Sequence, residues 1–136
     1  MTKVVIGLLI IIIICIIFIL STPGVNMLAD TARSNWQIAP WAPTLLFRSG
    51  SIAFHTLRYE KALNIYSEFL DKCGSNHKLS SLASFRMCKC YIELERNVDA
   101  ANELLWFMDN FPNDPNFSAA EGEYRILAHI PSFKSL

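Results

Sequence analysis

The chain begins with a long apolar run. Val4 to Leu20 reads VVIGLLIIIIICIIFIL without a single charged residue, and as a helix it would be about 25 Å long. Polar positions return at Ser21-Thr22-Pro23, which lack the small-x-small pattern of a signal-peptide cleavage site. A single span in lipid must be helical, because its backbone groups have no other hydrogen-bond partners there. We therefore predict a retained transmembrane anchor over residues 1–22.

The charges that flank this run indicate an orientation. Lys3 precedes it, whereas the first cation after it, Arg33, has Asp30 nearby. Because positive charge is retained on the cytoplasmic side of a membrane, we predict a cytoplasmic N-terminus. The rest of the chain then lies on the periplasmic side, or on another non-cytoplasmic side.

Residues 23–43 are predicted to form a linker that contains proline and tryptophan. Pro23-Gly24 is expected to end the membrane helix, and Asn26 to cap a short helix that runs to Trp36. Trp36 and Trp41 have two interpretations. Indole rings favour the headgroup layer of a membrane, or these two rings pack against the first helix of the following domain.

The hydrophobic pattern repeats in residues 44–136. Two stretches each contain an apolar helix, a short polar break and a second helix with alanine near its start. When Ala62 is aligned with Ala100, other positions of like character coincide: Gly50 with Cys88, Tyr66 with Leu104, and Phe69 with Phe107. A third apolar helix over residues 116–129 follows. The pattern predicts an all-α domain made of helical hairpins.

This layout resembles the tetratricopeptide repeat, a helix–turn–helix unit of about 34 residues. The signature positions are occupied in the second unit by Cys88, Tyr91, Ala100, Leu104, Phe107 and Pro112, and in the first by Gly50, Tyr59, Ala62 and Tyr66. The chain departs from the signature at Phe69, where alanine is usual, and at Cys73-Gly74, where proline is usual. The resemblance implies a short helical-hairpin solenoid of about two and a half repeats.

Composition and spacing argue against catalysis and nucleic-acid binding. Lys plus Arg and Asp plus Glu each number 12, so the basic surplus that phosphate binding requires is missing. Cys88 and Cys90 are separated by about 200° around a helix and can share a metal ion only if the helix breaks. His55, His77 and His129 fall on separate elements. We expect no cofactor, no metal and no enzymatic activity.

The resemblance implies that partners bind in a groove lined by the first helix of each unit. By position, this groove is expected to present aromatic, basic and apolar side chains: Phe47, Phe54, His55, Phe85, Arg86, Lys89 and Ile92. Ile130 and Phe133 continue an apolar surface that is a second candidate contact. Whether the large groove side chains complete the core or anchor a partner stays open at this point.

Together these features predict a non-catalytic, membrane-anchored scaffold. Its expected contacts are protein partners and the lipid around residues 4–20, without nucleic acid. The main hypothesis is an accessory or assembly subunit of a larger membrane complex, because about two and a half repeats are few for an independent domain. The alternative is a free-standing envelope adaptor that recruits peptides or proteins through its groove.

Overall fold

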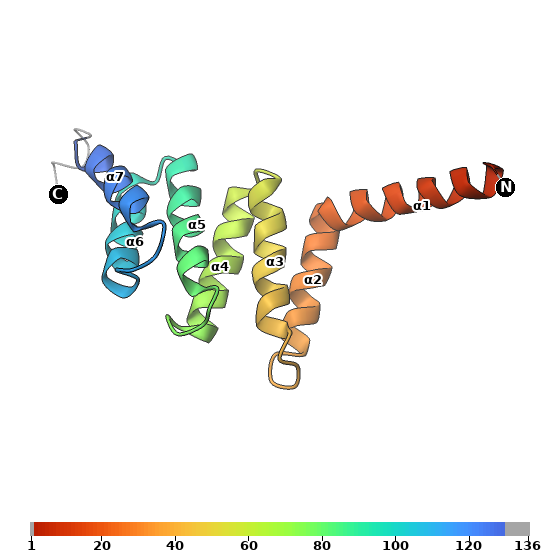
Figure 1. Cartoon of the computed structure of the whole chain (residues 1–136), viewed down its shortest axis with the longest axis horizontal. Helices are drawn as coiled ribbons and strands as arrows, with labels where there is room; N and C mark the ends of the chain where they lie inside the picture. The colour runs from red at the N-terminus through yellow and green to blue at the C-terminus, as the bar shows by residue number, and fades with distance from the viewer. Residues whose placement is uncertain (1, 130–136) are drawn as a thin grey trace.

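The structure, a computed structural model, describes residues 2–129. Within that range the chain is helical apart from short connections and contains no strand, so the all-α prediction is confirmed. The helices are α1 (Thr2–Leu20), α2 (Thr22–Ser34), α3 (Ala42–His55), α4 (Tyr59–Cys73), α5 (Ser80–Glu93), α6 (Asn97–Asn110) and α7 (Phe117–Ala128). Figure 1 shows them in one row, with α1 projecting from one end.

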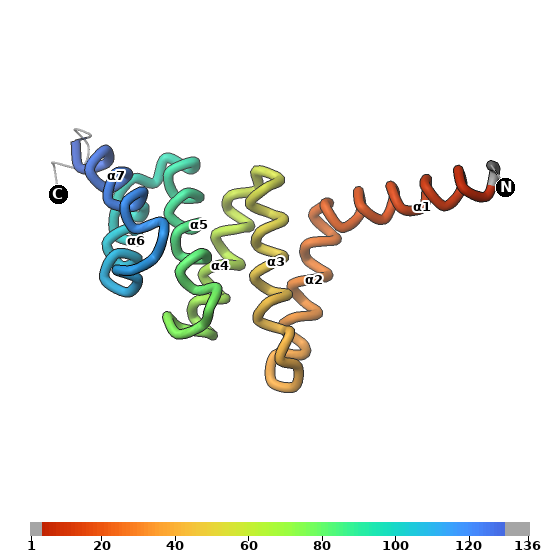
Figure 2. Tube along the Cα trace, in the orientation of Figure 1, coloured from red at the N-terminus to blue at the C-terminus, as the bar shows by residue number. Residues whose placement is uncertain are grey.

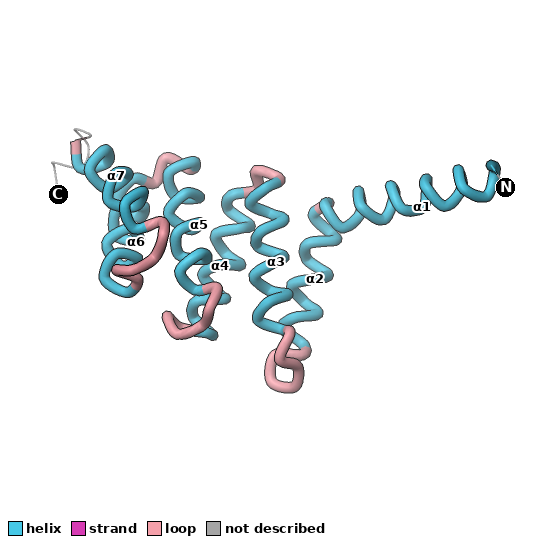
Figure 3. Tube along the Cα trace, viewed as in Figure 1, coloured by secondary structure: helices cyan, strands magenta, loops and turns pink. Residues whose placement is uncertain are grey.

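The row from α2 to α7 is a helical-repeat-like array. Each of these helices packs against the next one along the chain, and α3 also contacts α5 directly. The chain runs back and forth through the array in Figure 2, and Figure 3 shows that only short loops join the helices. Sequence neighbours therefore supply most of the packing, as in other arrays built from stacked helix pairs.

The two hairpins α3–α4 and α5–α6 have the same internal geometry. Each hairpin turns through one residue with a positive φ, Leu57 at 59° and Glu95 at 57°. In each turn the following residue donates its amide to the same helix position: Arg58 to the Ala53 carbonyl, and Arg96 to the Tyr91 carbonyl, both at 2.9 Å. A left-handed residue of this kind closes a helix C-terminus, although neither turn uses glycine.

The aligned positions of the two hairpins form their cores. Gly50 and Cys88 are buried in the middle of α3 and α5. A Cβ atom on Gly50 would lie only 3.0 Å from the Tyr66 ring. In the second hairpin the smaller Leu104 stands at the Tyr66 position and the larger Cys88 at the Gly50 position, and both are buried. In the first pair a glycine faces a large ring, and in the second a larger residue faces a smaller one. The total volume of each pair is thus similar, which keeps the packing dense.

The segment predicted as a linker is part of the array. Residues 22–34 form α2, which packs against α3 and buries Val25, Ala29 and Ala32 on one face. Pro23 lies in the first turn of α2, where its missing N–H costs nothing, so it begins this helix. Ser21 caps the helix, where Asn26 was expected. The folded body therefore starts near residue 22 and not at residue 44.

A sharp bend separates α1 from the array. Val4–Leu20 and Thr22–Ser34 meet at an angle of 71°. Gly24 sits inside the bend: a Cβ atom there would overlap the Phe18 carbonyl oxygen and lie 2.9 Å from the Cα of Ile19. The close approach of the two helices depends on the absence of that side chain.

The apolar helix α1 is followed by the bend and then by α2, which is more polar. In the described part of the chain no single helix is long and apolar enough to qualify as a span, whereas α1 and α2 qualify only when taken together as a bent pair. The single transmembrane helix therefore stays a prediction.

Candidate functional site

Arg86, one of the predicted groove residues, contacts two neighbouring helices. From α5, its Nη1 donates to the Ser51 hydroxyl at 2.6 Å and to the Tyr66 hydroxyl at 3.1 Å. The guanidinium also lies over two aromatic rings, 5.4 Å from the centre of Phe47 and 5.6 Å from that of Phe54. Burial raises the pKa of Tyr66, against the lowering effect of the hydrogen bond that it donates to Ser51 and the one that it accepts from Arg86. Arg86 thus joins α3, α4 and α5 into one contact.

The two phenylalanines on α3 differ in what they offer to a partner. Phe47 is 7% exposed and packs against Tyr66 and Phe69 in the core. Phe54 is only partly buried, with His55 and Tyr59 edge-on to its ring. His55 itself is exposed. Phe54 and His55 therefore have surface left for a partner, whereas Phe47 has little.

Lys89 on α5 faces the last described helix. Its Nζ pairs with the Glu123 carboxylate of α7 and lies 5.7 Å from the centre of the Phe85 ring. Phe85 and Ile92 are partly buried against the second core, in which Phe107 is fully buried. These predicted groove residues already have contacts within the chain, so a partner would compete with Glu123 for Lys89. Ile130 and Phe133 lie outside the described residues.

The two tryptophans proposed for a membrane interface have different surroundings. Trp36 is partly buried against the first core, and the Lys72 ammonium lies 4.8 Å from its ring centre. Trp41, which precedes α3, is 47% exposed. Packing against the helical array thus describes Trp36 better, whereas a position in the headgroup layer stays a prediction for Trp41.

The three cysteines of the helical array, Cys73, Cys88 and Cys90, are not activated. Burial raises the pKa of Cys90 to about 12 and that of Cys88 further still, because the charged thiolate is disfavoured in the core. Burial also raises the pKa of Cys73. A nucleophilic or metal-binding thiol needs the opposite shift. Among the described residues, no three His, Cys, Asp or Glu side chains converge to hold a metal ion.

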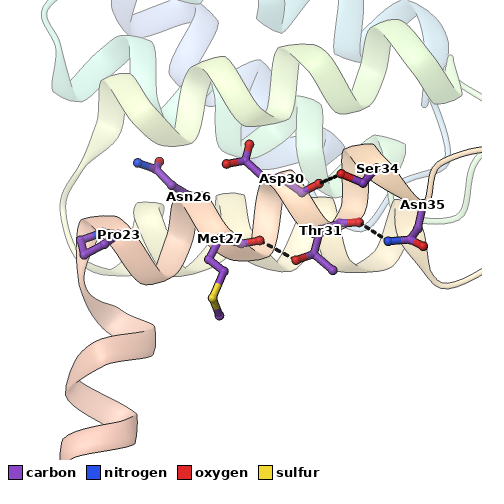
Figure 4. Close-up of a pocket in the computed structure, with 7 residues that line it drawn as sticks. All are labelled: Pro23, Asn26, Met27, Asp30, Thr31, Ser34 and Asn35. Carbon is purple, nitrogen blue, oxygen red and sulfur yellow. Dashed lines mark hydrogen bonds between the residues drawn. The ribbon is translucent and has the colours of Figure 1, made fainter.

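The outer face of α2 forms a shallow hollow between Pro23 and Asn35. Figure 4 shows Met27 and Thr31 on the side toward which α1 runs. The polar groups of this face bond to their own helix: Thr31 donates to the Met27 carbonyl at 2.7 Å, and Asn35 to the Thr31 carbonyl at 2.8 Å. The hollow therefore offers a polar surface with one exposed thioether, and its one carboxylate, Asp30, pairs with Arg33.

Glu103 is a candidate residue that the sequence analysis did not identify. It lies on α6 and is partly buried, and this burial raises the pKa of its carboxyl group against a hydrogen bond from Ser84. The alignment of the two hairpins contained the signal. Glu103 corresponds to Ile65, and Ser84 corresponds to Leu46, both of which are core residues of the first hairpin.

Comparisons with protein-family models, with curated proteins and with solved structures found no match. The resemblance to the tetratricopeptide repeat therefore stays a prediction that rests on the chain's own residues.

Proposed function

We propose that this protein is a non-catalytic, membrane-anchored scaffold of tetratricopeptide-like hairpins, an accessory or assembly subunit of a larger membrane complex. The observation that carries the proposal is the surface of α1. Every large hydrophobic side chain from Val4 to Leu20 is between 41% and 68% exposed.

Such a surface favours lipid over water. Burying apolar surface is favourable by roughly 25 cal/mol per Å², and α1 leaves its whole circumference uncovered by the array (Figure 1). A helix that docks in a protein groove is apolar on one stripe only. Because α1 is apolar all round, a surrounding of lipid chains suits it better than a single groove.

The bend sets the orientation of the array relative to the proposed bilayer. If α1 follows the membrane normal, the 71° angle places α2 close to the membrane plane. Met27 and Thr31 of the α2 hollow, which lie on the side toward which α1 runs (Figure 4), then face the headgroup layer. The exposed Ile38 and Trp41 follow α2 in the chain and are candidates for the same layer. With Lys3 on the cytoplasmic side, the array lies on the periplasmic side or another non-cytoplasmic side.

The spacing of contacts supports a repeat of tetratricopeptide type. Side-chain bonds between hairpins recur at separations of 34 to 36 residues: Arg33 with Glu68, Lys61 with Asn26, Arg58 with Thr22, Arg86 with Ser51, and Lys89 with Glu123. These separations are close to the unit of about 34 residues in that family, whereas the aligned residues Ala62 and Ala100 are 38 positions apart. In this interpretation α2 is the second helix of an incomplete unit, and α7 is the first helix of another.

The scaffold role rests on open ends and on the groove. Phe54 and His55 present free surface on α3, and Ile126 of α7 is exposed at the far end of the array. Apolar side chains left exposed at the end of a repeat array are suited to contact with another subunit. The alternative, an adaptor that recruits segments through the groove, would use the same surface of α3 and α5.

Membrane fractionation followed by purification in mild detergent tests the proposal. We expect the full chain to stay in the membrane after alkaline carbonate washing and to enter solution only with detergent. A matched variant with Ile10→Lys and Ile13→Lys should be released by the wash, because charges at the centre of a span are costly.

The same preparation separates the two roles. A stoichiometric complex after detergent extraction supports the subunit role, and a chain that runs alone supports the adaptor. Release of the unaltered chain by carbonate would refute the anchor and with it both membrane roles.

A further inference from the structure

A second candidate site lies away from the groove, where α4, α5 and α6 meet. A hollow of about 330 Å³ is lined by Leu70 and Asp71 of α4, Met87 and Tyr91 of α5, and Glu103 and Trp106 of α6. We refer to it as the α4–α6 hollow. It combines two carboxylates, two aromatic rings and an aliphatic floor, and its volume is within the usual range for binding pockets.

The carboxylate of Glu103 is held in place within this hollow. Ser84, which is fully buried, donates its hydroxyl to Oε1 of Glu103 at 2.7 Å. No cation of the described chain forms an ion pair with this carboxylate. In the same range, no fully buried side-chain oxygen or nitrogen lacks a hydrogen-bond partner. The second oxygen of Glu103, for which no partner occurs, is therefore accessible from the hollow.

One unit earlier in the chain, the residues at corresponding positions form an ion pair between two helices. Between α2 and α4, the gap is bridged by Arg33 of α2, whose guanidinium binds the Glu68 carboxylate through three contacts of 2.6 to 3.0 Å. Between α4 and α6, the last turn of the earlier helix supplies the anion Asp71 in place of a cation. By the alignment of Ala62 with Ala100, Asp71 corresponds to Arg33 and Trp106 corresponds to Glu68. The second unit thus has an anion and an aromatic ring where the first has an ion pair, and Glu103 adds a second carboxylate to the same hollow.

The polar pair at this position is also a departure within the repeat. The first hairpin has Leu46 and Ile65, both buried, where the second has Ser84 and Glu103. Replacing an aliphatic pair by a serine and a carboxylate destabilises a core unless the charge finds a partner. The ring of Trp106 adds a face that attracts cations, whereas the Tyr91 ring already has the Arg96 guanidinium 4.9 Å from its centre.

We propose that the α4–α6 hollow binds the basic side chain, lysine or arginine, of a protein partner. The ammonium or guanidinium group pairs with Glu103 and Asp71, and the apolar stem lies against Leu70, Met87 and the Trp106 ring. The site lies on a different surface from the groove and does not depend on the membrane anchor, so it goes beyond the function proposed above.

The test uses the full chain in detergent micelles, with the indole N–H signal of Trp106 followed by NMR. The probes are Nα-acetyl-lysine methylamide and Nα-acetyl-arginine methylamide. The norleucine analogue supplies the stem without the charge, and tetramethylammonium chloride supplies the charge without the stem. We expect at least one basic probe to saturate the shift with a Kd of about 1 mM, as suits one charged anchor, and neither control to do so.

Variants locate the binding. Glu103→Gln should raise the Kd of the basic probe about 10-fold or more, because a charge-assisted hydrogen bond is lost. Glu121→Gln removes the same charge from α7, where the carboxylate pairs with Arg125, and should leave binding unchanged. The double variant Ser84→Leu with Glu103→Ile installs the residues of the first hairpin and should fold without binding the probe.

Three outcomes would overturn the proposal. One is the absence of a saturable shift with either basic probe in a folded chain. Another is equal binding to the parent and to Glu103→Gln. The third is tighter binding of tetramethylammonium than of both basic probes, which would indicate a quaternary amine as the ligand.

Discussion

Arg58, at the turn between α3 and α4, donates from Nη2 to the carbonyl oxygen of Leu20 at 2.5 Å. Leu20 ends α1, and the last carbonyls of a helix have no partner within it. The same guanidinium donates to the hydroxyls of Thr22 and Thr56, both at 2.9 Å. One side chain of the repeat array therefore closes the C-terminus of the apolar helix and ties it to the first complete hairpin.

Replacing Arg58 by alanine is expected to loosen this junction. The bonds to Leu20 and Thr22 are lost, and the free energy of unfolding should fall by about 1 kcal/mol. The angle between α1 and the array should also broaden. Pulsed electron paramagnetic resonance between spin labels on Cys15 and Cys73 measures it, since Cys88 and Cys90 are buried. Arg48→Ala, at an exposed position on α3, is the control and should leave the distance distribution unchanged.

Gly24→Ala is expected to open the bend itself. The new Cβ atom would overlap the Phe18 carbonyl oxygen, and backbone atoms cannot yield as a flexible side chain can. The mean distance between labels on Cys15 and Cys73 should shift, and not only broaden. Gly122→Ala on α7 is the matched control, because its Cβ atom would meet nothing within 4 Å. An identical distance distribution in Gly24→Ala would show that the bend does not depend on this glycine.

Gly50→Ala should destabilise the first hairpin by roughly 1–3 kcal/mol through overpacking against the Tyr66 ring. Tyr66→Leu, which installs the residue found at Leu104, should relieve part of that cost. Chemical denaturation of the two single variants and the double variant gives the coupling energy, which we expect to favour the double variant by about 1 kcal/mol. If the changes in the free energy of unfolding of the two single variants simply add up in the double variant, the two positions do not compensate each other in volume.

Glu103 should make stability depend on pH in a direction opposite to that of a paired carboxylate. Its folded pKa is raised by burial, so the native state holds the proton more tightly than the unfolded chain does. Stability is therefore lost as pH rises from the ordinary glutamate pKa through the folded one. Glu103→Gln should be more stable than the parent at neutral pH, by on the order of 1 kcal/mol, and the difference should vanish in acid.

Glu68 affects the neighbouring pH range, below the ordinary glutamate pKa, and must be separated from Glu103. Its pKa is lowered by the hydrogen bonds from Arg33, so its contribution is lost as pH falls through that lowered value. The difference between the denaturation curves of the parent and Glu103→Gln isolates the Glu103 contribution. A constant difference at all pH values would contradict the raised pKa.

Thiol labelling should follow burial. A water-soluble maleimide applied to the native chain in membranes is expected to modify Cys73 slowly, because burial raises the pKa of that thiol. Cys88 and Cys90 are buried and should react only after denaturation. If α1 lies in lipid, Cys15 is protected in membranes despite its exposure on the bare chain. Mass spectrometry of tryptic peptides measures all four sites, and rapid modification of Cys15 in intact membranes would contradict the anchor.

The period of the sequence was sufficient to locate the two hairpins. The alignment of Ala62 with Ala100 places small, buried residues at corresponding points, because both helices must approach a neighbour closely there. The same alignment shows a glutamate, Glu103, at the position where the first hairpin has Ile65. What this glutamate can bind depends on where Ser84, Asp71 and Trp106 lie in the fold. Those residues are on three different helices, and no local pattern relates them.

The role of residues 22–34 could be decided only in three dimensions. Pro23 is compatible both with the end of one helix and with the first turn of the next, so the sequence alone does not exclude a linker. The packing of Val25, Ala29 and Ala32 against α3 makes this segment a helix of the array. Likewise Phe47 and Phe54 share α3, yet the angle at which α3, α4 and α5 pack buries the first and leaves the second partly exposed. Hydrophobic periodicity determines which residues share a face of a helix, whereas the crossing of neighbouring helices determines how much of that face is covered.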